Sequence, residues 1–249
     1  ASAYTAAVVA ADLTGAPVEE TSAAVSGTTP PVTVSVRTAG TDPDAAEPAA
    51  NGYAWVVPNN LVLFVFINAL ASAALIVAIR RAGVLTRAAA TRSGTTGVLV
   101  GLGVGWLLLA LAQSLLIIVV GAVGFGIDWG DPLGAALLVI AFAAVGCGAG
   151  LLVGAVGRDP DRASSVTPFA GIILGALGGC MVPLELFPPA VEAVAHITPH
   201  YWAVTAWREL LVDGAGVTGI LGSLAVLAAM AAALLAAASV VLRRQLTRG

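Results

Sequence analysis

Uncharged polar side chains are the groups that could contact a solute inside the long apolar segments of this 249-residue chain. Asn68, Ser72, Gln113 and Ser114 lie closest to the centres of those segments. Intramembrane carboxylates and histidines usually carry proton- or sodium-driven transport, and the apolar segments contain neither. Amides and hydroxyls can instead bond one helix to another or line a path for a solute. Both interpretations stay open, and an ion-driven motor is disfavoured.

A second set of side chains that could carry chemistry is Glu192, His196 and His200, which recur at four-residue intervals. On one continuous helix they would share a face and could hold a metal ion. Pro199 interrupts that helix, so we expect His200 to point elsewhere. A metal-dependent enzyme at the outer surface of a membrane is therefore only the alternative interpretation. The sequence has no G-x-x-x-x-G-K-[ST], H-E-x-x-H or G-x-S-x-G motif, which argues against ATP hydrolysis by this chain alone.

Five long runs without a charged residue must position these side chains. A helix needs about 20 apolar residues to cross a bilayer, and each run has about that many residues or more. The runs are 61–79, 98–126, 133–157, 166–184 and 214–242. The composition agrees, since 59% of the residues are hydrophobic and only 10% are charged. We predict an all-α polytopic membrane protein with five transmembrane helices.

The connections between the runs divide by charge. Alternate connections and the C-terminal tail hold nine of the eleven arginines, namely Arg80, Arg81, Arg87, Arg92, Arg158, Arg162, Arg243, Arg244 and Arg248. The remaining connections and the N-terminal segment hold twelve of the fourteen acids. Basic loops stay on the cytoplasmic side of a membrane. The sequence therefore predicts a multi-pass protein with its N-terminal segment outside and its C-terminus in the cytoplasm.

The first part of the chain, 1–57, is mostly polar and is interpreted as the end of an extracytoplasmic domain with a linker. The transmembrane domain is expected over 58–249. An acidic segment needs a leader or a preceding helix to cross a membrane, and nothing in this one resembles a signal peptide. We therefore expect at least one further span upstream of residue 1.

The last connection, Leu184–Asp213, differs from the others because it holds two predicted short helices. Pro188 and Pro189 suit a first helical turn, and Pro199 separates the two pieces. Neither piece is long enough to span a bilayer. We expect both to lie at the outer interface or to dip into it as re-entrant helices.

Close packing between spans is predicted from glycines at four-residue spacing, which let helix backbones approach each other. These are Gly101 and Gly105 in the second run, Gly146, Gly150 and Gly154 in the third, and Gly171, Gly175 and Gly179 in the fourth. Cys147 and Cys180 lie at different depths in their runs, so we expect two buried, unpaired cysteines.

The first arginine-rich loop, Arg80–Gly97, is long enough for two to three helical turns, and Val84–Ala90 is its most helical stretch. The loop could be a solvated segment that fixes orientation and touches lipid head groups. It could also be a docking helix for a cytoplasmic partner. The residues alone favour the first interpretation.

Two patterns resemble those of ABC-2-type permeases, the membrane-spanning subunits of ABC exporters. The segment Gly178–Leu210 resembles the family's glycine-rich span end followed by a proline, a Phe-Pro pair, a short helix and P-x-x-W. The matching residues are Gly178, Gly179, Pro183, Phe187, Pro188, Pro199 and Trp202, with Arg208 after them. Gly83, Leu85 and Arg87 resemble the G-x-L-x-R of the family's first cytoplasmic loop. Tyr53–Gly249 resembles the family's spans two to six in order and loop length.

The resemblance implies a six-span permease of the bacterial plasma membrane whose first span lies upstream of this chain. Two such subunits, identical or different, would associate with two cytoplasmic ABC ATPases. The ATPases would use the ATP and Mg²⁺, so no cofactor is expected in this chain. Their movement would be relayed through a coupling helix at Val84–Arg92. The residues of this coupling loop would be Gly83, Val84, Leu85, Arg87 and Arg92.

One position departs from the family pattern. Family members often carry a glutamate just before the glycine of this loop, where the present chain has Arg80 and Arg81. Either the ATPase contact is altered here, or another residue fills the role of the glutamate.

The resemblance also places a translocation path between two protomers. Its predicted lining residues are Asn68, Ser72, Gln113 and Phe169. An outer re-entrant motif would cap the path, and it consists of Pro183, Glu185, Phe187, Pro188, Pro199, Trp202 and Arg208. We therefore predict the permease subunit of an ATP-driven efflux transporter, without catalytic or metal-binding residues. A non-transporting membrane anchor or assembly factor is the third interpretation.

Overall fold

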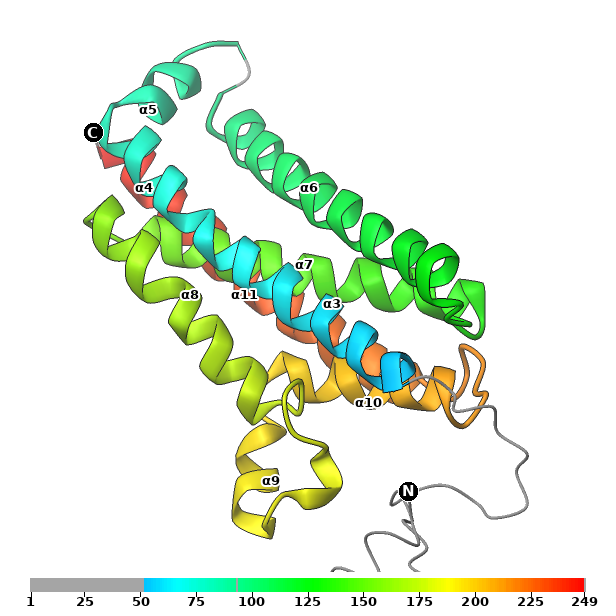
Figure 1. Cartoon of the computed structure of the whole chain (residues 1–249). Helices are drawn as coiled ribbons and strands as arrows, with labels where there is room; N and C mark the ends of the chain where they lie inside the picture. Colours follow the sequence, from blue (N-terminus) through cyan, green and yellow to red (C-terminus); the bar gives the residue numbers. More distant parts are fainter. Residues whose placement is uncertain (1–51, 93, 249) are drawn as a thin grey trace, which may run out of the picture. The chain divides into compact units, whose positions relative to one another are not determined.

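The computed structural model describes residues 52–92 and 94–248, which all belong to the second of the two units into which the chain divides, Pro48–Gly249. The extracytoplasmic segment expected before residue 52 lies outside the described residues, and the expected domain boundary at residue 57 stays a prediction. All regular structure in the described part is helical (Figure 1). This confirms the predicted all-α fold.

Among the described residues, four helices are long and apolar enough to cross a membrane. They are α3 (Gly52–Ala71) with its continuation α4 (Ala73–Arg81), α6 (Gly94–Phe125), α7 (Pro132–Val156) and α11 (Leu221–Arg248). These correspond to four of the five predicted spans. The remaining run, 166–184, falls on α8 (Pro160–Leu177), which has Asp161 in its polar first turn and is not among the four. The count of five spans stays a prediction.

Helix α8 departs from its predicted bounds, 166–184, at both ends. It begins earlier because the Asp159 carboxylate caps it, accepting hydrogen bonds from backbone N–H groups of the first turn. It ends seven residues early because Gly179 adopts a φ of 92°. The N–H of Cys180 then donates to the carbonyl of Gly175 at 2.9 Å, as in the Schellman ending of a helix. The prediction of one continuous helix to residue 184 is wrong.

Helix α7 packs against α3, α4, α6, α10 and α11. Its start is fixed by Asp131, whose carboxylate accepts the Gly134 N–H at 3.0 Å. Gly146, Gly150 and Gly154 face α3 and α4, and at Gly150 and Gly154 a side chain would not fit. A Cβ at Gly154 would lie 2.7 Å from the Cβ of Ile76. The glycine packing predicted for the third run is confirmed.

The other predicted glycine pairs behave differently. On α8, a Cβ at Gly171 would lie 3.0 Å from Ile67, and one at Gly175 would overlap the side chain of Leu63. On α6, a Cβ at Gly101 or at Gly105 would meet nothing within 4 Å. The glycine pattern therefore marks real contacts on α7 and α8 but is wrong for α6.

Short helices connect the longer ones. They are α5 (Val84–Ala89), the 3-10 turn η1 (Leu184–Leu186), α9 (Pro189–Ala195) and α10 (Pro199–Leu211). The two short helices predicted for the last connection are thus confirmed. Cys147 and Cys180 are both buried and unpaired, as expected.

Candidate translocation and coupling sites

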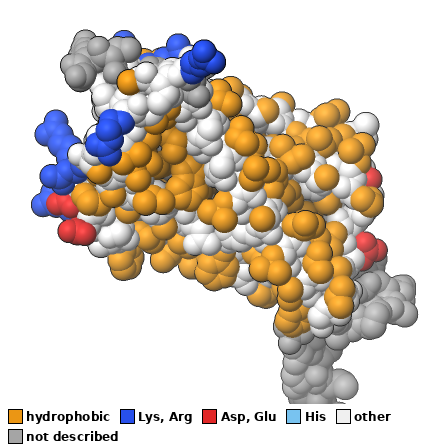
Figure 2. Space-filling view, turned by 90° about the horizontal axis from the view of Figure 1, so that it is seen from above, with side chains coloured by type: hydrophobic (Ala, Val, Ile, Leu, Met, Phe, Trp, Pro, Cys, Tyr) orange, Lys and Arg blue, Asp and Glu red, His pale blue; other side chains and the backbone are white. Residues whose placement is uncertain are grey.

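Charge separates one end of the helices from their long apolar middle. Figure 2 shows hydrophobic side chains over most of one face and basic side chains gathered at one end. This arginine-rich end is formed by the end of α4, by α5 and by the end of α11 (Figure 1). Arg81, Arg87 and Arg92 are exposed there.

Helix α5 lies at the arginine-rich end and packs against α4, α6 and α11. Gly83 begins it with a φ of 69°, a left-handed conformation that favours glycine. Leu85 is only 5% exposed, whereas Val84 is 41% exposed and Arg87 is exposed as well. One buried leucine therefore holds this short helix against its neighbours, while its other side is exposed.

Arg80 turns inward from the same end and bonds to two other helices. Its guanidinium donates to the carbonyls of Ala155 and Gly157 and, at 2.8 Å, to Oε1 of Gln245. The two carbonyls close the C-terminal end of α7, where unpaired carbonyls and the helix dipole favour a cation. Nε2 of Gln245 also donates to the carbonyl of Ala155 at 2.9 Å. Arg80 thus joins α4, α7 and α11, a role that the sequence did not predict.

Two of the predicted path residues meet across α3 and α6. Nδ2 of Asn68 donates to Oε1 of Gln113 at 3.0 Å. Asn68 is exposed and shares a stripe of α3–α4 with Phe64 and Leu75, which are 50% and 53% exposed. In Figure 1 this helix pair runs between α6 and α8. The arrangement presents one amide pair on an otherwise apolar face, where it could orient a bound solute.

The other two predicted path residues do not join this pair. The Ser72 hydroxyl donates to the carbonyl of Ala69 in its own helix, at 2.5 Å. Phe169 is 66% exposed on α8, beside Val166 and Ile173, which are similarly exposed. Ser72 therefore has a local contact, and Phe169 belongs to a separate apolar stripe on α8.

Thr167 is a contact residue that sequence reasoning missed. Its hydroxyl lies 3.0 Å from the carbonyl of Leu70 on α3 and 2.6 Å from that of Ala163 in α8. The side chain is buried. It therefore links α8 to the helix that carries the amide pair.

The predicted outer re-entrant motif is held by two side-chain contacts. Nη1 of Arg208 lies 2.5 Å from Oε1 of Glu185, with both side chains more than half exposed. Nε1 of Trp202 donates to the carbonyl of His196 at 2.9 Å. These contacts join η1 and α9 to α10.

The three prolines and the phenylalanine of this motif mark the helix boundaries. Pro183 precedes η1, Phe187 follows it, Pro188 precedes α9, and Pro199 is the first residue of α10. Each proline stands where no helical backbone N–H is needed. The motif residues therefore fix the path of the chain between α8 and α10.

His200 is completely buried and separate from the other two candidate metal ligands. Its ring centroid lies 4.5 Å from that of Phe66 and 5.7 Å from that of Phe142, in edge contacts. Nδ1 of His196 instead contacts the carbonyl of Glu192 at 2.7 Å. The three residues share no face, so the geometry does not support the metal-site interpretation.

The position of His200 also fixes the level at which α10 begins. Phe142 is ten residues into α7, which corresponds to about 15 Å along a helix. The first turn of α10 therefore lies well inside the ends of the long helices. That this helix is re-entrant in a membrane stays a prediction, and an imidazole buried there without a hydrogen-bond partner is expected to be neutral.

Comparison with known proteins gives the same family as the motifs. The sequence profile of the family described as ABC-2 family transporter protein matches residues 3–240. The linearmycin resistance permease protein LnrN of Bacillus subtilis (strain 168) is 30% identical over 190 residues, which cover 73% of this chain and 47% of LnrN. The chain spans about half the length of this relative. No solved structure matches the chain. This chain therefore belongs to the ABC-2 family of transporter proteins and forms long apolar helices of a membrane permease.

Proposed function

We propose that this chain forms the membrane-spanning part of an exporter permease that is driven by separate cytoplasmic ATPase subunits. The observation that carries the proposal is the geometry of α5. It is a short helix between two long apolar helices, with Leu85 buried and Val84 and Arg87 open to a partner. The arginine-rich end would be cytoplasmic, which puts the C-terminus inside and the N-terminal segment outside. The ATPase would supply the ATP and Mg²⁺ site.

The translocation path is proposed to run along the exposed stripe of α3–α4 and to be completed by a second permease subunit. The Asn68–Gln113 amide pair is the polar group on that stripe. Beyond their mutual bond, the two amides keep N–H donors on both nitrogens and acceptor lone pairs on both oxygens for a solute. The outer motif around Glu185 and Arg208 would close the outer end.

The transported compound is proposed to be an apolar or amphipathic antibiotic-like molecule. LnrN is named as a permease for linearmycin resistance, and the proposed path here is apolar apart from one amide pair. Ligand sites commonly combine apolar walls with a few polar groups that fix orientation.

The coupling part of the proposal is tested by replacing Leu85 and Arg87 together with alanine in the full-length protein. The change removes the buried anchor and one exposed cation of α5, so the ATPase should be lost during co-purification. Arg81→Ala is the matched control, because Arg81 is exposed at the same end but lies outside α5. Undisturbed co-purification of the ATPase with the double variant would contradict the coupling role.

The path is tested separately with Asn68→Leu. Export measured in vesicles should fall severalfold, because the amide pair is removed, while the ATPase still co-purifies. Asn68→Gln keeps an amide and should retain part of the activity. An unchanged export rate in the Asn68→Leu protein would remove this pair from the path.

A further inference from the structure

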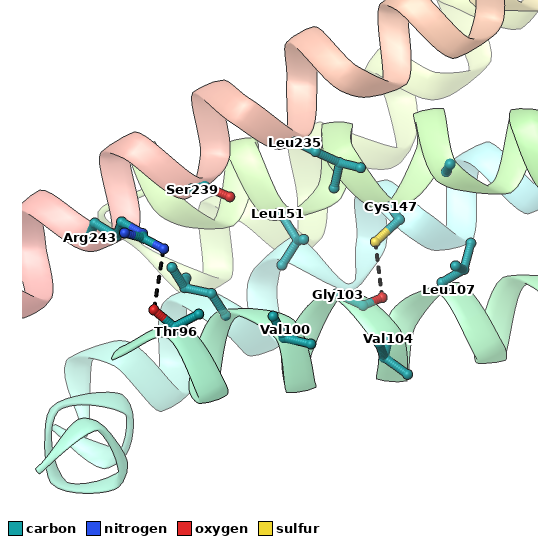
Figure 3. Close-up of a pocket in the computed structure, with 12 residues that line it drawn as sticks. Thr96, Val100, Gly103, Val104, Leu107, Cys147, Leu151, Leu235, Ser239 and Arg243 are labelled. Atoms are coloured by element: carbon teal, nitrogen blue, oxygen red, sulfur yellow. Dashed lines mark hydrogen bonds between the residues drawn. The ribbon is translucent and has the colours of Figure 1, made fainter. Parts of the chain in front are cut away.

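A cavity of about 330 Å³ lies between α6, α7 and α11, near the arginine-rich end. Figure 3 shows Val100, Gly103 and Val104 of α6 along one wall, Cys147 and Leu151 of α7 behind it, and residues of α11 opposite. Its size is within the range of small-molecule sites, about 300–1,000 Å³. None of the residues discussed for coupling or translocation lines it.

The two ends of the cavity differ in polarity. At one end, Nη2 of Arg243 donates to Oγ1 of Thr96 at 3.3 Å (Figure 3). Ser239 lies near that end, and the remaining walls are almost entirely aliphatic. An occupant that matches this surface has a charged or polar head and an apolar tail.

The length of the cavity fits one leaflet of a bilayer. It extends along α6 from Thr96 to Leu107, a helical distance of about 16 Å. The hydrocarbon core of a bilayer is about 30 Å thick, so one leaflet accounts for about half of that. Arg243 and Thr96 then stand where the head groups of that leaflet begin.

The cavity opens at the outer surface of the helices. Val100 and Val104 line it and are 57% and 48% exposed. Gln113, by contrast, points from α6 toward Asn68 of α3. The cavity and the proposed translocation path thus lie on different sides of α6, which separates their occupants.

We propose that this cavity binds one acyl chain of an anionic phospholipid from the leaflet at the arginine-rich end, with the lipid phosphate on Arg243 and Thr96. A guanidinium matches phosphate geometry with two parallel N–H donors, and a threonine hydroxyl adds a third. Basic pockets between transmembrane helices on the cytoplasmic side favour anionic head groups. The acyl chain fills the aliphatic slot between α6 and α11.

Two pairs of variants of the full-length protein test the site. Arg243→Gln removes the cation, and Arg244→Gln is its control because Arg244 does not line the cavity. Gly103→Leu fills the slot, and the glycine tolerates a side chain because its Cβ would lie 4.0 Å from the nearest atom, Cδ1 of Leu151. Gly105→Leu is the control on the same helix, since a Cβ there meets nothing within 4 Å and the residue is not in the lining.

Each protein is reconstituted in bilayer discs of equal parts phosphatidylglycerol and phosphatidylcholine and then examined by native mass spectrometry for retained lipid. The parent protein and both controls should retain phosphatidylglycerol in preference to phosphatidylcholine. Arg243→Gln should lower that retention roughly tenfold, as expected for loss of a charge-assisted contact. Gly103→Leu should lower retention of either lipid at this site. Because this variant keeps Arg243, it distinguishes the effect of filling the slot from the effect of removing the charge.

Three results would overturn the proposal. Equal retention of phosphatidylglycerol by all five proteins would show that the lipid binds elsewhere. Displacement of the retained lipid by the transported compound would assign the cavity to the substrate. A change of oligomeric state in Gly103→Leu at unchanged lipid retention would make this face a protein interface. If Arg243→Gln fails to fold, Thr96→Val with Gly103→Leu decides the same question.

Discussion

Helices α6 and α7 are equally hydrophobic but differ in how much of their surface is buried against other helices. Half of the most apolar stretch of α7 is buried, compared with 17% of that of α6. On α7, Gly146, Gly150 and Gly154 admit α3 and α4 at close range. On α6, Gly101 and Gly105 meet no neighbour, and Val100, Leu108 and related side chains remain exposed.

The difference between α6 and α7 shows what allows helices to contact each other in a bilayer, where the lipid is as apolar as the side chains. Association of helices in a bilayer depends on close packing and hydrogen bonds rather than on apolar burial. The α3–α4, α7 and α8 group has both, whereas α6 has hydrogen bonds to other helices but no close approach at Gly101 or Gly105. One wall of the proposed lipid site and half of the amide pair lie on α6, so both proposed ligand sites include the less buried of these two helices.

The largest effect is expected from Gly150→Leu, a substitution in the close contact between α7 and α3. A Cβ at Gly150 would overlap the carbonyl of Ala69, so the backbones of α7 and α3 must separate. Overpacking of this kind costs about 3 kcal/mol, which corresponds to a fall of roughly 10 °C in apparent melting temperature. Thermal unfolding in detergent, followed by size-exclusion fluorescence, measures it. Gly105→Leu should leave the melting temperature nearly unchanged, and equal effects of the two variants would refute the contrast.

Arg80→Leu should have the next largest effect, because it removes the donors that close the C-terminal end of α7. Hydrogen bonds to charged groups contribute about 1.5–3 kcal/mol, and the carbonyls of Ala155 and Gly157 would both lose the Arg80 donor. The same melting experiment should show a loss of about 2 kcal/mol in the free energy of unfolding. Arg81→Leu should change little, because Arg81 is exposed. A similar loss in both variants would show that general charge, not the Arg80 contacts, is responsible.

Thr167→Val should have a smaller effect on the melting temperature. Together with Ser114→Ala, it compares a hydroxyl that reaches a neighbouring helix with one that bonds only within its own helix. The Thr167 hydroxyl lies between the carbonyl of Leu70 on α3 and that of Ala163 in its own helix. The hydroxyl of Ser114 on α6 donates only to the carbonyl of Ala110 in its own helix, at 2.8 Å. Loss of one interhelical bond in a membrane protein costs about 0.6 kcal/mol. Thr167→Val should therefore destabilise the protein more than Ser114→Ala does in parallel melting curves. The reverse order would show that the buried hydroxyl on α6 matters more.

The smallest effect is expected outside both regions, from Glu185→Gln. The Glu185–Arg208 pair is more than half exposed on both sides, and such pairs contribute about 0–1 kcal/mol. The variant should shift the melting temperature by no more than about 2 °C, and the shift should vanish at high salt. A larger, salt-independent shift would show that this pair supports the outer motif structurally.

Much of the fold could be predicted because the length of an apolar run sets the length of a helix. Four of the five runs became long apolar helices, and Gly83 and Leu85 stand at the start and at the buried side of α5, in the loop where a helix was predicted. The early end of α8 was missed although its signal, the Gly178–Gly179 pair, is present in the sequence. Glycine after a helical run marks a C-terminal end, and the hydrophobicity of the following residues concealed it.

The contacts of the candidate site were harder to predict than its residues. Asn68 and Gln113 were expected on one path, and the structure pairs their side chains, while the path itself stays a prediction. The role of Arg80 depends on carbonyls 75 and 77 residues away. A carbonyl has the same chemistry at every position, so no pattern in the sequence identifies which one an arginine will meet.

The early end of α8 brings a second helix directly against its last turn. A Cβ at Gly178 would meet the backbone N–H of Tyr201 at 2.8 Å, within the first turn of α10. The irregular stretch that follows α8 is covered by protein, since Gly178, Gly179 and Cys180 are all buried. Any side chain larger than hydrogen at residue 178 would push the two helices apart, so this one glycine sets the distance between the end of α8 and the start of α10.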